Sequence, residues 1–133
     1  MNHQDLANQF NNFSFELIIN HLDINDKIVS IQDEVFLRRV IFSRYYYALY
    51  HKYLAHDKAL RVSTGAGKHD IILRKVKNCG DPKLFQTFSK LKALRVWADY
   101  NLDDTDANNA LRISLIKLRQ DVYSITNRAN INC

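Results

Sequence analysis

The sequence predicts an all-α protein: an up-and-down four-helix bundle with an additional short helix, forming a single domain over residues 1–133. Three observations predict this fold. The chain has 133 residues, enough for one hydrophobic core but not for two. It contains three glycines and one proline, which disfavours turn-rich β architectures. Apolar residues recur at intervals of three and four along nearly the whole chain, as they do in amphipathic helices.

The first two helices are predicted over residues 4–23 and 31–60. In the first, the expected inner face consists of Leu6, Phe10, Phe13, Leu17 and Ile24. The second begins at Ser30, whose hydroxyl can cap a backbone N–H while Asp33 returns the bond. Its expected inner face consists of Leu37, Val40, Ile41, Ala48 and Leu54.

Three further helices are predicted over residues 68–78, 82–102 and 107–129. Gly80 is placed to end the short one as a left-handed cap. Asp81 and Pro82 are a capping residue and a first-turn proline for the next. The acidic cluster at 103–106 suits the positive end of the last helix dipole. The apolar positions of these helices are Ile71, Ile72 and Val76, then Leu84, Phe88, Leu91, Ala98 and Leu102, then Ala107, Leu111, Leu118, Val122 and Ile125.

Positive charge is concentrated in the middle of the chain. Residues 35–95 carry fourteen Lys and Arg against three acids, whereas residues 1–34 carry one against six and residues 96–133 four against five. A basic segment interleaved with aromatic residues is compatible with a phosphate-bearing partner, RNA or nucleotide. Solvated helix faces balanced by an acidic partner explain the same pattern.

Polar residues at inner-face positions are the candidate site residues, because burying them unpaired is costly. Arg95 interrupts the stripe between Leu91 and Ala98, and Asp99 follows at the spacing of an i,i+4 ion pair. His51 interrupts the long helix, with Arg44 seven residues earlier on the same face, about 10 Å away. An imidazole can move the 2′-hydroxyl or leaving-group proton of RNA while a guanidinium stabilises the phosphorane. A buried structural ion pair and a core histidine are the alternative interpretation.

Three segments stand out together: Ser43-Arg44-Tyr45-Tyr46-Tyr47-Ala48-Leu49-Tyr50-His51, Lys68-His69-Asp70 and Arg95-Val96-Trp97-Ala98-Asp99-Tyr100. Over most of residues 30–130 this pattern resembles the HEPN family. The resemblance implies a helical bundle that forms a homodimer, and a gene often beside that of a minimal nucleotidyltransferase antitoxin. It also implies the metal-independent endoribonuclease activity of toxin–antitoxin and phage-defence members.

Ribonuclease members of that family use an Arg and a His separated by four to six residues, usually late in the bundle. Arg44 and His51 have six residues between them but lie in the long middle helix, and Tyr45 follows the Arg where a polar residue is common. The other candidate pair, Arg61 and His69, has seven. For RNA cleavage we expect His51 as the acid or base and Arg44 or Arg95 as the phosphate-binding cation. The expected orienting or stacking neighbours are Tyr47, Asp99 and Tyr100, with His69 as the reserve candidate.

Two other functions remain open on the sequence: a non-catalytic module that binds nucleotide, RNA or a nucleotidyltransferase partner, and a structural adaptor. We expect no metal or cofactor, since a di-iron bundle needs about four Glu and the chain has Glu16 and Glu34. Five tyrosines, at 45–47, 50 and 53, cannot all face one core, so some should be exposed or at a dimer contact.

Cys79 and Cys133 cannot form a disulfide framework, and we expect Cys79 to pack at a helix end. The start of the chain lacks the basic and apolar pattern of a secretion signal. A reducing cytoplasm and no membrane association are therefore expected.

Overall fold

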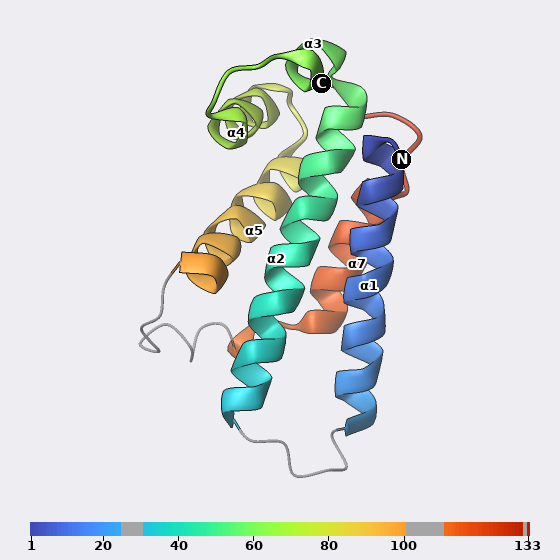
Figure 1. Cartoon of the computed structure of the whole chain (residues 1–133), viewed down its shortest axis with the longest axis vertical. Coiled ribbons are helices and arrows are strands. Elements are labelled where there is room, and N and C mark those ends of the chain that lie inside the picture. The colour runs from blue at the N-terminus through green and yellow to red at the C-terminus, as the bar shows by residue number, and fades with distance from the viewer. Residues whose placement is uncertain (25–30, 101–110, 132) are drawn as a thin grey trace.

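The computed structural model describes residues 1–24, 31–100, 111–131 and 133, with residues 20–24 and 31–33 described for their backbone alone. The described residues form six helices and no strand, so the protein is all-α as predicted (Figure 1). Within this part of the chain, no helix combines the length and hydropathy needed to cross a membrane. The helices are α1 (His3–Ile24), α2 (Ile31–His56), α3 (Lys58–Val62), α4 (Lys68–Asn78), α5 (Pro82–Tyr100) and α7 (Leu115–Thr126).

Helix α2 is the centre of the fold and contacts α1, α3, α4, α5 and α7 (Figure 1). Because neighbours cover α2 on several sides, it buries more of its circumference than a helix at the edge of a bundle does. Tyr45, Tyr46 and Tyr53 are accordingly buried, and Tyr47 and Tyr50 are half-buried. None of these five tyrosines is exposed within the single chain, and the dimer contact expected as the alternative stays a prediction.

One cluster of buried side chains draws on every described helix. Its largest fully buried members are Tyr45, Tyr46, Phe42, Phe88, Ile18 and Ile41. The predicted inner residues of α5 and α7 are confirmed at Leu84, Phe88, Leu91, Leu118, Val122 and Ile125, all of which are buried. Ile24, Leu102 and Ala107 lie outside the residues whose side chains are described.

The buried face of α1 differs from the predicted one. Ala7, Asn11, Ser14 and Ile18 are buried, whereas Phe13 is 47% exposed. Small side chains on the contact line let two helices approach closely, and larger residues then lie on either side of the line. Phe10 and Phe13 were predicted on the inner face. Phe10 is half-buried and packs against the core cluster, whereas Phe13 is exposed, and both line the candidate site between α1 and α2.

The long helix predicted over residues 31–60 is interrupted at Asp57. Its φ and ψ angles, −102° and 88°, are not helical, and its carboxylate accepts a hydrogen bond from the Leu60 N–H at 3.0 Å. Lys75 of α4 pairs with the same carboxylate at 2.8 Å. An aspartate that caps a following helix favours a break over continued helix, because its side chain satisfies an otherwise unpaired N–H. The chain therefore turns at Asp57 into α3.

The predicted restart before α5 is confirmed. Gly80 has a φ of +80°, which fits its expected role as a left-handed cap. The Asp81 carboxylate accepts from the Leu84 N–H at 3.1 Å, and Pro82 is the first residue of α5. At the other end of α5, the Arg39 guanidinium donates to the carbonyls of Trp97 and Ala98.

The last helix starts later than predicted. Residues 111–112 are helical, but Ile113 and Ser114 leave the helix, and α7 begins at Leu115. The Ser114 hydroxyl accepts from the Lys117 N–H at 3.2 Å and so caps α7. The acidic cluster at 103–106, the predicted cap, lies outside the described residues, as does Ser30.

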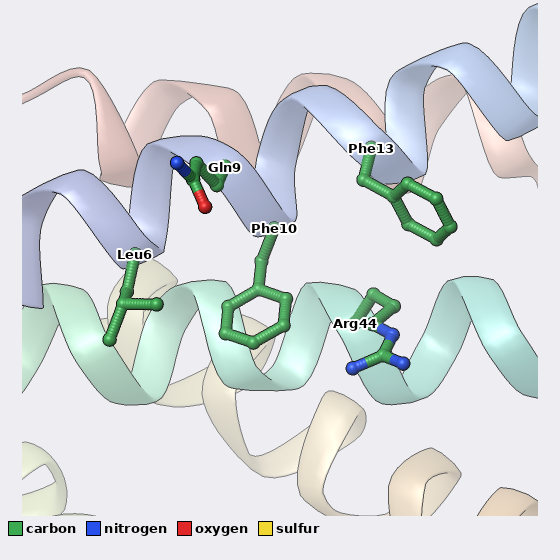
Figure 2. A pocket seen from close by; sticks show the side chains of 5 residues that line it. All are labelled: Leu6, Gln9, Phe10, Phe13 and Arg44. Atoms are coloured by element: carbon green, nitrogen blue, oxygen red, sulfur yellow. The ribbon is translucent and has the colours of Figure 1, made fainter. Parts of the chain in front are cut away.

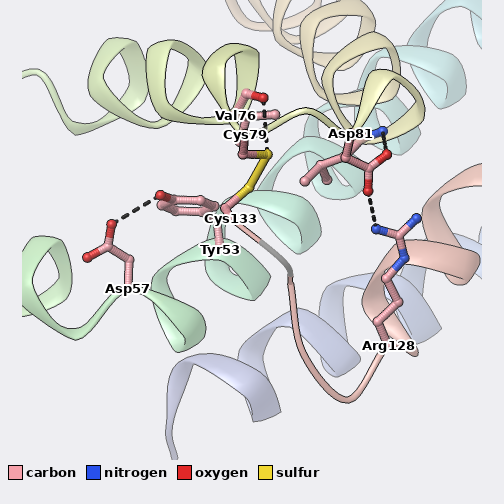
Figure 3. The surroundings of a disulfide bond; sticks show 8 residues. Tyr53, Asp57, Val76, Cys79, Asp81, Arg128 and Cys133 are labelled. Atoms are coloured by element: carbon pink, nitrogen blue, oxygen red, sulfur yellow. Dashed lines mark hydrogen bonds and ion pairs between the residues drawn. A yellow bond between two sulfur atoms is a disulfide. The ribbon is translucent and has the colours of Figure 1, made fainter.

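The C-terminal tail folds back onto the turn between α4 and α5 (Figure 3). There a disulfide joins Cys79 to Cys133, and Arg128 pairs with Asp81 at 2.7 Å. Cys79 is half-buried at the end of α4, as expected. The disulfide was not expected, because 54 residues separate the two cysteines and their spacing carries no motif.

Candidate functional site

His51 is half-buried in the seam between α1 and α2. Its ring stacks on Phe10 with centroids 5.7 Å apart and on His3 with centroids 4.9 Å apart. The Nδ1 atoms of His3 and His51 are 2.7 Å apart. A hydrogen bond of this kind needs one ring to donate and the other to accept, so the two neutral imidazoles are opposite tautomers at Nδ1.

The surroundings of His51 disfavour its charged form. Burial, followed by the nearby His3 and His69 rings, lowers the pKa of His51 from 6.5 to about 4. Burial, followed by Arg61 and Lys68, lowers the pKa of His3 as well. Near neutral pH the two stacked rings are therefore uncharged, and a nitrogen lone pair remains available for proton transfer.

Arg44 lies on the exposed face of α2, about two helical turns before His51. Its guanidinium carbon is 5.6 Å from the centre of the Phe10 ring and 6.0 Å from that of Phe13. Among the described residues, no carboxylate forms an ion pair with Arg44. Within the described part of the chain, aromatic faces are what this charge contacts, and it is available to an anion.

A hollow of about 390 Å³ opens between α1 and α2 at this point (Figure 2). We call it the Phe10 hollow. Two aromatic rings, one aliphatic side chain, one amide and one guanidinium line it: Phe10, Phe13, Leu6, Gln9 and Arg44. His51 stacks on Phe10, one of the lining residues, and therefore lies next to the hollow.

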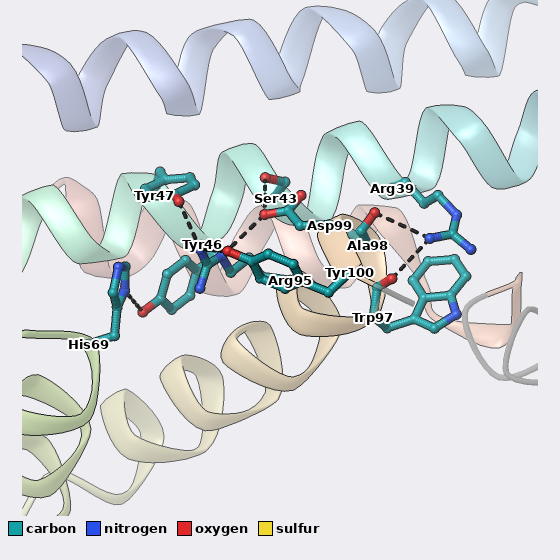
Figure 4. A network of polar contacts seen from close by, with 10 residues as sticks. All are labelled: Arg39, Ser43, Tyr46, Tyr47, His69, Arg95, Trp97, Ala98, Asp99 and Tyr100. Atoms are coloured by element: carbon teal, nitrogen blue, oxygen red, sulfur yellow. Dashed lines mark hydrogen bonds and ion pairs between the residues drawn. The ribbon is translucent and has the colours of Figure 1, made fainter. Parts of the chain in front are cut away.

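A polar network on the other side of α2 is centred on Arg95 of α5 (Figure 4). The Arg95 Nε donates to Asp99 at 3.2 Å, which confirms the predicted i,i+4 pair. Its Nη2 donates to the hydroxyls of Tyr47 and Tyr100, each at 3.0 Å. Ser43 of α2 also donates to Asp99, at 3.3 Å. The Arg95 side chain is only 11% exposed, so these contacts surround it.

Tyr47 separates the Arg95 network from the histidines. Its ring centre is 5.4 Å from the Arg95 guanidinium carbon, 6.4 Å from the His51 ring and 6.3 Å from the His69 ring. Tyr47 also contacts Phe10, at 5.9 Å between ring centres. Tyr47, predicted as an orienting neighbour, thus contacts both His51 and the Arg95 network.

His69, at the start of α4, belongs to the same aromatic group. Its Nδ1 is 2.6 Å from the Tyr46 hydroxyl, and its ring stacks on Tyr50 at 4.5 Å. Burial, with smaller contributions from Arg95 and Lys92, lowers the pKa of His69. Burial raises the pKa of Tyr46, so this hydroxyl keeps its proton. His69 is therefore a third neutral imidazole, whose Nδ1 is hydrogen-bonded with the Tyr46 hydroxyl.

The structure brings most of the predicted site residues together, but in two groups. His51 and Arg44 share the Phe10 ring, whereas Arg95, Asp99 and Tyr100 form the network beyond Tyr47. His51 forms no hydrogen bond with an arginine among the residues described. Three further site residues were missed: His3 was not considered, and the periodicity of α1 assigned Phe10 and Phe13 to the core. The pattern that could have indicated them lies in α1. There the small or polar residues form one stripe and larger side chains form another: Ala7, Asn11 and Ser14, then Leu6, Phe10 and Phe13.

No group of three His, Cys, Asp or Glu side chains that could hold a metal ion occurs in the described part of the chain. What the arrangement offers is an exposed cation, a neutral imidazole and aromatic faces, which together suit an anion that carries a planar group. The chain matches no protein-family model, no curated protein and no solved structure.

Proposed function

We propose that the protein is a HEPN-type endoribonuclease that cleaves RNA without a metal ion, with Arg44 and His51 acting on one phosphodiester. The observation that supports this most is their shared contact with Phe10. The guanidinium carbon of Arg44 is 5.6 Å from the centre of the Phe10 ring, and the centre of the His51 ring is 5.7 Å from it. A phosphate lying over Phe10 would face a cation on one side and a base on the other.

The chemistry follows from the protonation states. If His51 donates its Nδ1 proton to His3, its Nε2 carries the lone pair and can take the proton of a ribose 2′-hydroxyl. The 2′-oxygen then attacks phosphorus, and Arg44 stabilises the charge of the phosphorane. The bond from phosphorus to the 5′-oxygen breaks, and His51 returns the proton to that oxygen. The products are a 2′,3′-cyclic phosphate and a 5′-hydroxyl.

Arg95 is a positioning residue in this proposal. Its hydrogen bonds hold Tyr47 and Tyr100, and Tyr47 in turn packs against His51. Its partner Asp99 and its low exposure leave it less available to an external phosphate than the exposed Arg44. Of the two cations expected from the sequence, Arg44 is the better candidate for the reacting phosphate.

The family resemblance extends the proposal to fold and partners. The long helices α1, α2, α5 and α7 would form the up-and-down bundle of a HEPN toxin or phage-defence protein. A homodimer is supported by an exposed aromatic side chain at the Arg95 network, Tyr100 at 66%. A nucleotidyltransferase antitoxin would control the activity. The protein would act on RNA in the cytoplasm.

The test is cleavage of a synthetic RNA in the presence of EDTA, with analysis of the product ends. The wild-type protein should cut and leave 2′,3′-cyclic phosphate and 5′-hydroxyl ends. Replacing the ribose at the cleaved position with 2′-deoxyribose should stop cutting there, because the nucleophile is lost. His51→Gln and Arg44→Gln should each reduce the rate at least about 100-fold, the usual scale for removing a general base or a transition-state charge partner.

Two matched variants control for fold and charge. His56→Gln changes an exposed histidine on the same helix, and Arg74→Gln changes an exposed arginine on α4. Both should cut at the wild-type rate. Cutting that survives His51→Gln, or that requires a divalent metal ion, would contradict the proposal.

A second candidate is a non-catalytic module that binds RNA or nucleotide. The lowered pKa values of His51, His3 and His69 favour it, because an imidazole whose pKa is lowered is a weak proton acceptor. In that case wild-type protein would leave RNA intact and shift its electrophoretic mobility, with binding that weakens as salt rises.

A further inference from the structure

We infer that the Phe10 hollow is a subsite for one unpaired base of an RNA strand, next to the phosphate that Arg44 and His51 would contact. The inference rests on the proposed function for the identity of the strand, and it adds which form of RNA the site can accept. Four features of the hollow support it: its walls, its charge, its amide and its position.

The walls of the hollow are aromatic faces. Phe13 is 47% exposed although it is a large apolar side chain, and Phe10 stands beside it on the next turn of α1. Figure 2 shows both rings on the side of α1 that faces Arg44. Exposed aromatic rings on which bases stack are the common means of binding single-stranded nucleic acid, because every base has a π face.

The charge of the hollow suits a nucleotide rather than an uncharged aromatic ligand. Arg44 lines it, and among the described residues no acidic side chain does. Its guanidinium lies within 6.0 Å of the centres of both rings, so a base stacked on Phe13 would have its own phosphate at Arg44. The guanidinium of Arg44 would thus bind the phosphate, and the base would stack on the rings.

The amide of Gln9 gives the hollow a group that can recognise a base edge. Gln9 is exposed and forms no hydrogen bond to any described residue. A side-chain amide offers both a donor and an acceptor, the combination that pairs with the edge of a base. Discrimination among bases would therefore come from Gln9, while the rings would bind any base.

The position of the hollow decides the form of the RNA. His51 stacks on the same Phe10 ring that lines the hollow, so base and reacting phosphate would belong to neighbouring parts of one strand. A base inside a duplex has both faces stacked and its pairing edge occupied, and it cannot enter such a site. The substrate would be single-stranded RNA or a loop.

The test uses the full-length protein and a 2′-O-methyl RNA octamer, which cannot be cleaved because it lacks the 2′-hydroxyl. Binding is measured by fluorescence anisotropy for the single strand and for the same strand annealed to its complement. The wild type should prefer the single strand. Phe13→Leu should weaken single-strand binding about 5- to 150-fold, the loss of one stacked base, and leave duplex binding unchanged.

Three controls make the result specific. Phe36→Leu removes an aromatic ring that is 65% exposed on α2 and does not line the hollow, and it should change nothing. Phe13→Tyr keeps a stacking ring and should bind like the wild type. Octamers that lack one base at a time should show a single position whose loss reproduces the effect of Phe13→Leu. A nucleoside 5′-monophosphate should displace the fluorescent octamer less readily than unlabelled octamer does. That result would assign the site to a strand rather than to a free nucleotide.

Equal affinity for single strand and duplex would overturn the inference, as would full binding by Phe13→Leu. Tighter binding of the monophosphate than of the octamer would also overturn it. Failure of the proposed function is visible separately. Phe13-dependent binding without cleavage of unmodified RNA would refute the nuclease and keep the base subsite, whereas His51-dependent cleavage that is indifferent to Phe13 and to pairing would refute the subsite and keep the nuclease.

Discussion

The low pKa of His51 makes the stability of the protein depend on pH in a defined window. The group has a pKa of about 4 in the folded protein and 6.5 as a free side chain. Between these values the unfolded chain binds the proton more readily than the folded protein does. The contribution of neutral His51 to stability is therefore complete above pH 6.5 and is lost as the pH falls towards 4.

The size of this effect follows from the two pKa values. At about 1.4 kcal/mol per pH unit, the difference corresponds to at most about 3–4 kcal/mol. Solvent reaches part of the half-buried ring and screens it, so we expect about 1–2 kcal/mol. His51→Gln removes the titration, and the free energy of unfolding of the wild type should fall by that amount more than that of the variant between pH 6.5 and 4.

The assay is urea denaturation followed by far-UV circular dichroism at several pH values. Three carboxylates also cost stability in acid, because hydrogen bonds lower their pKa values in the folded protein. The main partner is Lys75 for Asp57, Lys92 for Asp70 and the Leu84 N–H for Asp81. The difference between wild type and His51→Gln cancels them. His56→Gln should follow the wild type. A difference between wild type and His51→Gln that stays constant from pH 7 to pH 4 would refute the assignment of His51 as a neutral, desolvated imidazole.

Three further substitutions test the packing and the polar contacts around the site. Phe88→Ala should lower the free energy of unfolding by about 3–5 kcal/mol, because Phe88 is 1% exposed and its removal leaves a cavity beside Tyr46; a loss under about 1 kcal/mol in urea denaturation would show a looser core. Tyr47→Phe should cost about 1–3 kcal/mol by leaving an N–H of the largely buried Arg95 without its hydroxyl partner, and unchanged stability in the same assay would contradict that bond. Asp57→Ala should cost about 1–2 kcal/mol through loss of the α3 cap, with faster amide exchange at residues 58–62; protection at wild-type level there would be evidence against the cap.

The helices could be predicted because their signals are local. The Gly80, Asp81 and Pro82 sequence ends one helix and begins the next, and the structure confirms it. The break at Asp57 was missed because the residues around it keep helical spacing, so the sequence pattern shows no break. Asp57 can cap a helix only where the preceding helix ends. The disulfide was missed for a similar reason: only the fold of the tail brings Cys133 to Cys79.

The candidate site could be predicted in part, from the residues that interrupt apolar stripes. The Arg95 and Asp99 pair follows from i,i+4 spacing and is confirmed. The role of Phe10 and Phe13 depends on how closely α1 approaches α2, which is a tertiary property. His3 gave no signal because its contact with His51 joins residues 48 apart in the sequence.

The most direct test of a phosphate held between Arg44 and His51 is an NMR titration of the His51 ring proton Hε1 with and without a 2′-O-methyl RNA dinucleotide. An anion at Arg44 favours the charged imidazolium, so the His51 pKa should rise from about 4 towards neutrality when the dinucleotide binds, and should not rise in Arg44→Gln. A His51 resonance that titrates identically with saturating dinucleotide and without it would contradict the shared site.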